Sequence, residues 1–238
     1  MKRIIGIDLA WGERKPDGVC AMDVEGKSAL VMETSLTRGD NELIAWVFRH
    51  ASCLPTLLAV DAPLVCPNVT GARPVDRLTH VHFGRFYAGS HPANATRCCR
   101  PLRVASLLAK LGFRIGWEFS AGKEPDRLML EVYPHPAMIR LFNLRQRIAY
   151  KIGPVAQRRI QFSHLQSLLR QSLDRDFRSV RTDQHTDSLL NCSWSKNVED
   201  QTDAFFCALI GYWHWIHLGG KSEILGDLAT GFILVPNP

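Results

Sequence analysis

The sequence predicts a single α/β domain spanning residues 1–238, in which three antiparallel strands are followed by strands parallel to the first. Two features of the element order support this class: a hairpin follows the N-terminal strand, and later apolar strands alternate with helices. The third is size, because 238 residues can bury one substantial core and no Ser/Gly-rich linker divides the chain. We expect helices on both faces of a mixed sheet.

The first three strands are expected at residues 3–9, 18–24 and 28–36. The first is apolar on both sides of the pleat until its end, which is typical of a strand in the middle of a sheet. Gly26 lies in the short turn between the second and third strands, where a glycine suits a tight hairpin. The sheet therefore opens with antiparallel strands.

A helix is expected at residues 40–51, where apolar side chains recur at helical spacing and Asp40 is a candidate N-cap. Residues 57–61 then form a new buried strand. Three strands in hairpin order, a helix and a central strand are the opening of the RNase H-like arrangement, in which later strands lie parallel to the first. The element order thus predicts an RNase H-like mixed sheet.

Residues 62–127 read as an insertion that lies over the functional site. The segment is rich in Pro, Gly, Arg and His, and it has little periodicity apart from a helix expected at residues 101–112. A strand follows at residues 128–132, and Pro134 and Pro136 stop it and set the start of a helix.

The last part of the chain predicts two long helices and a hairpin. Residues 155–173 form an amphipathic helix, and residues 198–218 form an apolar helix rich in aromatic side chains. A terminal hairpin is expected at residues 224–225 and 232–235, around glycines.

Three of the predicted strands end in acidic residues, namely Asp8, Asp61 and Glu131. A carboxylate beside Val, Leu and Ile is costly to bury unless it is paired, hydrogen-bonded or bound to metal. The carboxyl ends of parallel strands meet at one edge of a sheet, so we expect these acids around one crevice. Asp200 and Asp203 join them, because their spacing places both on one face of a helix.

This set of acids predicts a metal site. We expect Asp8, Asp61, Asp200 and Asp203 to hold Mg²⁺ or Mn²⁺, because hard cations prefer carboxylate oxygens. Two such ions activate water and stabilise the leaving oxygen in phosphodiester cleavage, which makes Asp8, Asp61, Glu131 and Asp203 the candidate catalytic residues. A structural role stays open for single acids, since Asp200 complements a helix dipole and Asp8 or Asp61 caps a turn.

Five segments carry a family resemblance: residues 5–11 (IGIDLAW), 60–64 (VDAPL), 89–94 (GSHPAN), 131–136 (EVYPHP) and 200–204 (DQTDA). Together they resemble, over nearly the whole chain, the family of predicted RNase H-like nucleases labelled domain of unknown function 429. The resemblance implies an RNase H-like fold and a metal-dependent nuclease activity. By position, Asp8 matches the acid of the first strand, Asp61 the acid ending the fourth strand, and Asp203 the acid of the final helix. Glu131 and Asp200 match family motifs without an assigned role.

Four further residues are candidates for substrate binding. Arg85, His91 and Asn94 lie in a loop segment that is placed to cover the acids, and the resemblance makes them substrate contacts. Lys151 either brings an ammonium to a phosphate or is an exposed loop lysine, and the sequence leaves both interpretations open. Zinc is not expected, because the His-x-His pair in this segment has no suitably spaced cysteine.

The same part of the chain is rich in arginine, at positions Arg73, Arg77, Arg85, Arg97, Arg100 and Arg103. With the aromatic residues among them, these side chains suit a channel that grips phosphates and stacks bases. An ordinary insertion that packs its aromatics and solvates its arginines accounts for them equally. A formal charge of +6 permits a nucleic-acid partner without requiring one.

The cysteines and the hydropathy indicate the compartment. Seven Cys without a C-x-x-C pair indicate reduced thiols, and no stretch is long and apolar enough for a membrane span or a signal peptide. We therefore expect a cytoplasmic protein without a membrane partner. A homodimer is compatible with the sequence, because Trp213, Trp215 and Ile216 form either core or a dimer contact.

Two alternatives to a metal-dependent nuclease remain at this point. One is a non-catalytic binding protein with the same fold. The other is an ATP-dependent kinase of small molecules, which the sequence disfavours. Such kinases cradle phosphates in a Gly- and Ser/Thr-rich turn after the first strand, whereas residues 9–12 (LAWG) supply one glycine and no hydroxyl.

Overall fold

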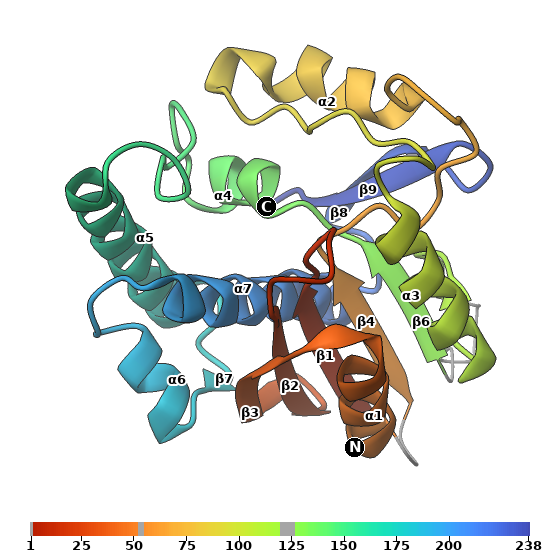
Figure 1. The fold of residues 1–238 in the computed structure, drawn as a ribbon. Coiled ribbons are helices and arrows are strands. Elements are labelled where there is room, and N and C mark those ends of the chain that lie inside the picture. Colours follow the sequence, from red (N-terminus) through yellow and green to blue (C-terminus); the bar gives the residue numbers. More distant parts are fainter. Residues whose placement is uncertain (1, 52–54, 120–126) are drawn as a thin grey trace.

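The computed structural model describes residues 2–51, 55–119 and 127–238. Within these ranges the main sheet has seven strands in the order β5-β6-β4-β1-β2-β3-β7 (Figure 1). The strands are β1 (Lys2–Asp8), β2 (Asp17–Glu25), β3 (Ser28–Thr37), β4 (Thr56–Val60), β5 (Arg114–Ile115), β6 (Arg127–Glu131) and β7 (Val180–Arg181). β1, β2 and β3 are antiparallel, whereas β4 and β6 run parallel to β1. The predicted α/β fold with a mixed sheet is confirmed.

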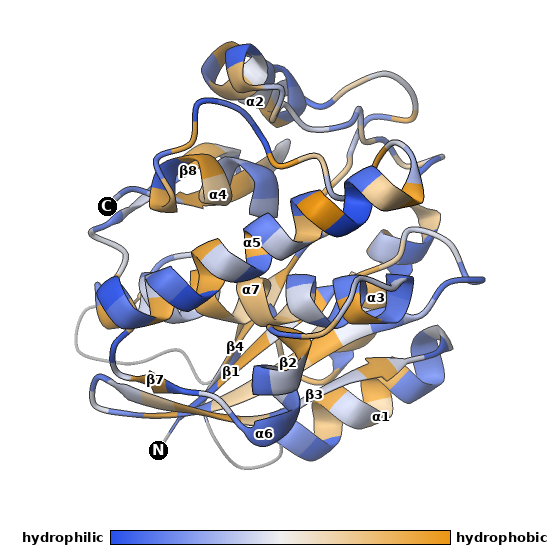
Figure 2. Cartoon of the chain, turned by 90° about the vertical axis from the view of Figure 1, so that its left-hand side faces the viewer, coloured by the Kyte–Doolittle hydropathy of each residue, from blue (hydrophilic) through white to orange (hydrophobic). Residues whose placement is uncertain are grey.

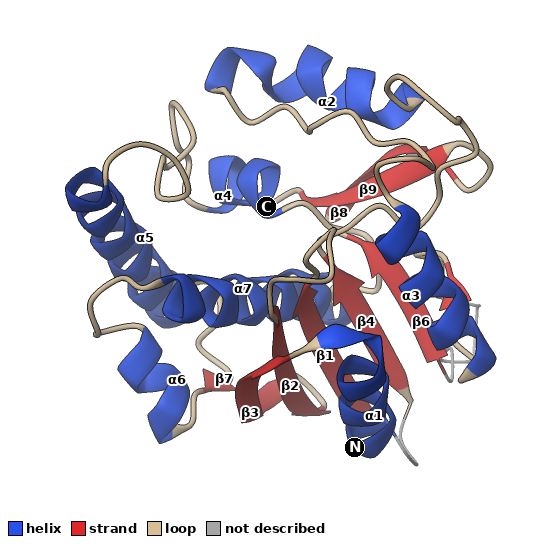
Figure 3. Cartoon of the chain, viewed as in Figure 1, coloured by secondary structure: helices blue, strands red, loops and turns tan. Residues whose placement is uncertain are grey.

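Helices cover both faces of the sheet (Figure 3). α1 and α3 pack on one face, and α7 and α5 lie on the other. The helices are α1 (Gly39–Ala51), α2 (Pro74–Phe83), the 3₁₀ turn η1 (Gly84–Phe86), α3 (Cys99–Lys110), α4 (Pro134–Leu141), α5 (Val155–Arg175), α6 (Gln184–Leu189) and α7 (Lys196–Ile216). None of the helices in the described ranges is long and apolar enough to span a membrane.

The side chains of β1 alternate between two cores. Ile4 packs in the core beneath α7, whereas Ile5 and Ile7 pack in the core beneath α1 and α3. Figure 2 shows the apolar strands enclosed by helices with hydrophilic outward positions. Trp213 and Trp215 are buried in the core beneath α7, so these two side chains do not form the exposed dimer contact that the sequence left open.

A third layer stands over one end of the sheet. α2, α4 and the hairpin of β8 (Ser222–Asp227) and β9 (Gly231–Pro236) lie beyond the edge at which β4 and β6 finish (Figure 1). They share a small apolar core that includes Val75, Ile139 and Val235. This layer forms a wall above the carboxyl ends of the central strands.

The segment at 62–127 divides between the core and this upper layer, and residues 120–126 lie outside the described residues. α3 packs Val104 and Leu108 against α1, so this helix is part of the main core. α2 was not predicted, because its buried positions include the polar Asp76 and Thr79 and therefore show no apolar periodicity. The strands β5 and β7 have two residues each, too few for a detectable pattern.

α7 lies directly against the backbone of β1 and β2. A Cβ atom on Gly6 would be 2.1 Å from the carbonyl oxygen of Ala204, and one on Gly18 would be 2.0 Å from the carbonyl oxygen of Asp200. Any side chain at these positions would force the helix outward. The two glycines thus place the start of α7 against the end of β1.

Gly6→Ala is expected to lower the free energy of unfolding by about 3 kcal/mol, because the added methyl group must displace helical backbone. Denaturant unfolding followed by circular dichroism measures the change. Gly12→Ala is the matched control, since a Cβ at Gly12 would meet nothing within 4 Å. Equal stabilities of the two variants would contradict the close contact between α7 and β1.

Candidate active site

A cavity of about 710 Å³ opens at the carboxyl ends of β1, β4 and β6. Its walls come from the loop after β1, the segments that follow β4 and β6, the start of α7 and the hairpin residue Ile233. Ionisable residues contribute much of this lining: Asp8, Glu13, Arg14, Lys15, Asp61, Arg73, His91, Glu131, His135, Lys151, Lys196 and Asp200. The cavity therefore lies where the sequence places its acids.

The strand register brings Asp8 and Asp61 side by side. Ile7 pairs with Val60 in the parallel β1–β4 ladder, and the Asp61 N–H donates to Ile7 O over 2.8 Å. Ile7 and Val60 both point to the core beneath α1 and α3, so the next residue of each strand points to the α7 side. Asp200 and Asp203, near the start of α7, are buried on that same side.

Lys151 lies among these carboxylates. Its ammonium is 2.7 Å from Asp203 Oδ2, and the Tyr150 hydroxyl donates to Asp203 Oδ1 over 2.7 Å. Burial alone would lower the pKa of Lys151, but Asp203, Asp8 and Asp61 together raise it well above its ordinary value. Lys151 is thus a charged group, 30% exposed, that belongs to the acid cluster.

A second lysine pairs with the other acid of α7. Lys196 donates to Asp200 Oδ1 and to Glu199 Oε1, each over 2.6 Å. The second oxygen of Asp200, Oδ2, is buried and has no hydrogen-bond donor in the part of the chain that the structure describes. One buried carboxylate oxygen of the cluster therefore has no described donor to offset the cost of its burial.

Burial and mutual repulsion make the ionised form of these carboxylates unfavourable. Burial raises the pKa of Asp8 from 3.8 to about 6, with Lys151 opposing the rise and Asp200 adding to it. Burial likewise raises the pKa of Asp61 well above 3.8, and Asp8 and Asp203 add to that rise. The four aspartates share two lysines, one of which also pairs with Glu199, so negative charge is left uncompensated when every group is ionised.

The donor chemistry fits a hard divalent cation. The acids offer only oxygen ligands, Asp200 Oδ2 has no donor among the described residues, and the excess charge is negative. As the side chains stand, no three His, Cys, Asp or Glu among the described residues form a group that holds a metal ion. The ammonium of Lys151 pairs with Asp203 and offsets only part of the charge of Asp8 and Asp61.

Glu131 differs from the other predicted acids. It is in register with Val60 and therefore points to the opposite face of the sheet from Asp61. Arg73 donates to both of its oxygens, over 2.9 and 2.7 Å, and the Leu64 N–H donates to Oε2 over 3.0 Å. The structure does not bring the Glu131 carboxylate into the cluster of aspartates, although Glu131 lines the cavity.

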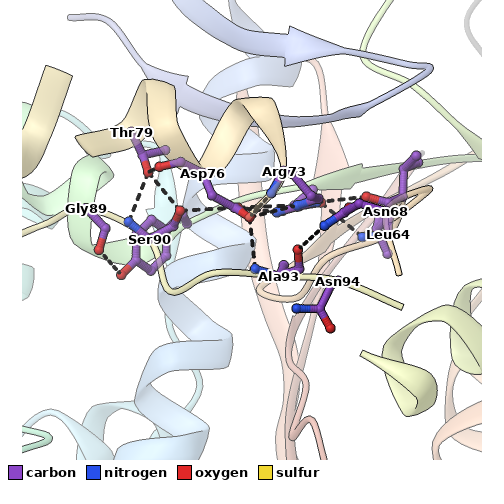
Figure 4. Close-up of polar contacts among 12 residues, drawn as sticks. Leu64, Asn68, Arg73, Asp76, Thr79, Gly89, Ser90, Ala93 and Asn94 are labelled. Atoms are coloured by element: carbon purple, nitrogen blue, oxygen red, sulfur yellow. Dashed lines mark hydrogen bonds and ion pairs between the residues drawn. The ribbon is translucent and has the colours of Figure 1, made fainter. Parts of the chain in front are cut away.

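Arg73 links Glu131 to the loop that covers the cavity. This fully buried side chain also donates to Asp76 Oδ1 over 2.9 Å (Figure 4). Asp76 Oδ2 in turn accepts from the Ala93 N–H over 2.9 Å, and Ser90 contacts Thr79 over 2.8 Å. The buried network fixes residues 90–93, which include the cavity residue His91, above the carboxyl end of β6.

The predicted substrate contacts separate into two pairs. His91 and Lys151 line the cavity. Arg85 lies outside the cavity lining, stacked on the Phe86 ring at 4.6 Å. Asn94 is also outside the lining and is used structurally, because it donates to Gly71 O and accepts from the Arg97 N–H. The structure thus gives Arg85 and Asn94 no place at the cavity.

The arginines of the insertion do not form one channel. Arg73 is buried in the Glu131 network, Arg100 is buried against Asp17 and Asp40, and Arg103 pairs with Asp40 and Glu13. Arg73 and Arg100 are therefore buried in ion pairs within the fold, whereas the ordinary interpretation of the insertion expected solvated arginines. Arg77 and Arg97 are exposed, as that interpretation expected.

Several cavity residues were not singled out as candidates from the sequence. Lys196 lies four residues before Asp200, and this helical spacing is the signal that reveals it. Arg14 and Lys15 are exposed at the rim, and they follow the first acid in an irregular segment. Burial lowers the pKa of His135 to about 3, so a neutral imidazole lies in the wall. His135 lies in the EVYPHP segment that carries the family resemblance, and this is the signal that could have singled it out.

The fold and the cavity define an α/β protein with a carboxylate and ammonium site at the carboxyl edge of its sheet. Residues 6–227 match the family model described as Protein of unknown function (DUF429), and the chain belongs to this family. The match confirms the family identified from the five motifs, and its description states no activity. No curated protein and no solved structure matches the chain.

Asp8→Asn is expected to stabilise the protein by about 2 kcal/mol at pH 7.5, which is less than the full pKa shift corresponds to, because the Asp8 side chain is half-buried. A carboxyl whose pKa is raised on folding opposes folding above that pKa, and the penalty disappears as the pH falls from about 6 through 3.8. The advantage of the variant should therefore shrink between these values. Urea unfolding at a series of pH values measures it.

Asp203→Asn is the contrasting variant, because it leaves the Lys151 ammonium without its ion-pair partner. Burial raises the pKa of Asp203 to about 6 as well, so its ionised form also opposes folding, and loss of the ion pair with Lys151 acts in the other direction. We therefore expect Asp203→Asn to be less stable than Asp8→Asn by about 2 kcal/mol. Equal stabilisation by both substitutions would contradict the role of Asp203 as the anchor of Lys151.

Arg73→Leu is expected to lower the free energy of unfolding by about 4 kcal/mol, because it leaves two buried carboxylates unpaired. Thermal and urea unfolding measure the effect. The control is Arg77→Leu, since Arg77 is an exposed residue of the same helix. Arg73→Lys should restore only part of the loss, because an ammonium cannot reproduce the bidentate contact.

Proposed function

We propose that the chain is a metal-dependent hydrolase that cleaves phosphodiester bonds in nucleic acid. The observation that carries the proposal is the convergence of Asp8, Asp61 and Asp200 at one cavity, where Asp200 Oδ2 is buried and no described residue donates a hydrogen bond to it. Acids that raise one another's pKa in a cleft are typical of sites that bind cations or move protons.

The sheet topology supports the proposal. Three antiparallel strands, then β4 and β6 parallel to β1, follow the order expected of an RNase H-like fold. Asp8 and Asp61 end neighbouring strands and Asp203 is on the last long helix, which are the positions that the family resemblance gives to the nuclease acids.

Asp8, Asp61 and Asp200 would hold Mg²⁺ or Mn²⁺, with water completing the coordination. The bound ion supplies Lewis-acid stabilisation of the phosphate and a water of lowered pKa for attack. Asp8 must be ionised to act as a ligand, so protons would compete with the cation for this carboxylate and metal binding would weaken as the pH falls.

Lys151 is proposed to contact the scissile phosphate. Asp203 and Tyr150 fix its position from below, and the ammonium is partly exposed to the cavity. A cation held in this way stabilises the negative charge that develops on a phosphate oxygen during cleavage. Asp203 acts here as a positioning residue for Lys151.

The rim suits a polyanion. Arg14 and Lys15 are exposed where the cavity opens, and Trp11 presents an aromatic side chain to the same space. Cationic side chains at a cavity mouth bind phosphates without reading sequence, and the binding weakens as salt rises.

We also propose that the protein works in the cytoplasm. Six cysteines of the described residues are free thiols, and Cys99 and Cys192 among them are exposed. Exposed free thiols suit a reducing compartment.

Calorimetric titration of Mn²⁺ tests the metal site. We expect the wild-type chain to bind, and Asp8→Asn and Asp61→Asn each to weaken binding at least about tenfold. Asp174→Asn is the control, because Asp174 is an exposed residue of α5 away from this cavity. Absence of Mn²⁺ binding by the wild type, with and without nucleic acid, would refute the metal-dependent mechanism.

Cleavage of single-stranded, double-stranded and branched DNA and RNA with Mg²⁺ or Mn²⁺ tests the activity. Lys151→Met should abolish cleavage, and joint replacement of Arg14 and Lys15 by Ala should weaken nucleic-acid binding while leaving the Mn²⁺ titration unchanged. Metal binding without cleavage of any of these substrates would refute the nuclease activity and favour a non-catalytic metal-binding protein.

A further inference from the structure

Two cysteines lie in contact outside the proposed metal site. Cys66 follows β4, Cys98 immediately precedes α3, and both belong to one small buried cluster with Ala93. Their thiols are hydrogen-bonded to each other. Cys98 is fully buried, whereas Cys66 retains 8% exposure.

The two segments that carry these thiols are aligned by several hydrogen bonds. The Asn68 side chain donates to Ala93 O over 3.0 Å, as Figure 4 shows, and the Ala95 N–H donates to Asn68 O over 2.9 Å. The Thr96 hydroxyl donates to Val69 O over 2.9 Å. The two loops are therefore held beside each other before any covalent bond forms.

We propose that Cys66 and Cys98 are a modification site, at which hydrogen peroxide forms an intramolecular disulfide. The two thiols share one buried cluster, and their loops are already in register. Arg73 favours the thiolate form of both and Glu131 opposes it, and Cys98 occupies the N-cap position of a 12-residue helix without a side-chain capping hydrogen bond.

The two thiols are chemically unequal. The hydrogen bond with Cys66 lowers the pKa of Cys98 to about 7, and Asn94 and Arg73 act in the same direction. The same hydrogen bond, together with burial, raises the pKa of Cys66. Cys98 is therefore the thiolate that attacks, and Cys66 is the thiol that resolves the product.

The reaction balances as follows. The Cys98 thiolate attacks one oxygen of hydrogen peroxide, the O–O bond breaks, and a sulfenic acid forms with release of hydroxide, which takes up the thiol proton to give water. Cys66 then attacks the Cys98 sulfur, the S–S bond forms, the S–O bond breaks and a second water leaves. The thiols lose two electrons, and one peroxide is reduced to two waters.

The site adjoins the cavity without using its acids. Trp11, which lines the cavity, packs against the cysteine cluster, and the residue before Cys66 accepts a hydrogen bond from Arg73 through its carbonyl oxygen. The proposal is independent of the metal site, because no aspartate of the cluster takes part.

Peptide mapping under non-reducing conditions tests the proposal. The background is the full chain with Cys53→Ser, Cys99→Ser and Cys192→Ser, which removes the exposed thiols and the one outside the described residues. After treatment with hydrogen peroxide we expect a peptide joining Cys66 to Cys98, reversible by dithiothreitol. We expect the pair to react at least about tenfold faster than the buried Cys207, whose pKa is raised by burial.

Two single variants test the assigned roles. In Cys66→Ser the sulfenic acid on Cys98 has no resolving thiol, so dimedone should trap it, whereas Cys98→Ser should yield neither a disulfide nor an adduct. Circular dichroism checks that both variants fold. Protein unfolded in urea should lose the preference for this pair.

The proposal would be overturned if Cys66 and Cys98 both remained thiols in the folded protein, or if they were oxidised no faster than Cys207. A dimedone adduct on Cys66 of Cys98→Ser at the rate seen for Cys98 would overturn the assignment of Cys98 as the attacking thiol. Metal binding is not part of any readout, so failure here is distinguishable from failure of the proposed nuclease.

Discussion

The close packing of α7 on β1 and β2 is the constraint on which the site depends. Gly6 and Gly18 let the helix backbone touch the strand backbone, and α7 carries Asp200 and Asp203 to the end of β1. A helix held at ordinary distance by side chains would separate these acids from Asp8 and Asp61. Gly6 and Gly18 therefore determine how closely the acids of the site lie together, although neither glycine contributes a functional group to it.

That charge density is balanced from within the fold. Lys151 pairs with Asp203 and Lys196 with Glu199 and Asp200, whereas a third cation, Arg73, pairs with Glu131 and Asp76 on the opposite face of the sheet. The acids thus divide between two systems. One is a hydrogen-bonded network that holds the covering loop, and the other is a cluster with excess negative charge and a buried carboxylate oxygen that has no donor among the described residues. The second system is the one that offers a free carboxylate oxygen to a further cation.

The sequence predicted the order of strands, both long helices and the placement of Asp8 and Asp61 at one edge, because these follow from hydrophobic periodicity. It did not separate Glu131 from them, since a shift of one residue in register reverses the face of a strand and no local signal records register. Lys151 and Tyr150 likewise depend on a loop that is brought to Asp203 only by tertiary packing. α2 escaped prediction because its buried face is polar.

The cavity draws its walls from both ends of the chain. Asp8 belongs to the first strand, whereas Ile233 belongs to the last, and Leu234 forms a parallel bridge with Val132 beside the central strands. During ribosomal synthesis the early strands are available long before α7 and the hairpin emerge. The acids at the ends of β1 and β4 therefore stay hydrated until α7, the helix that buries them, has been made and packs on the sheet. A nascent chain therefore has no assembled site until residues as far as Ile233 have been made.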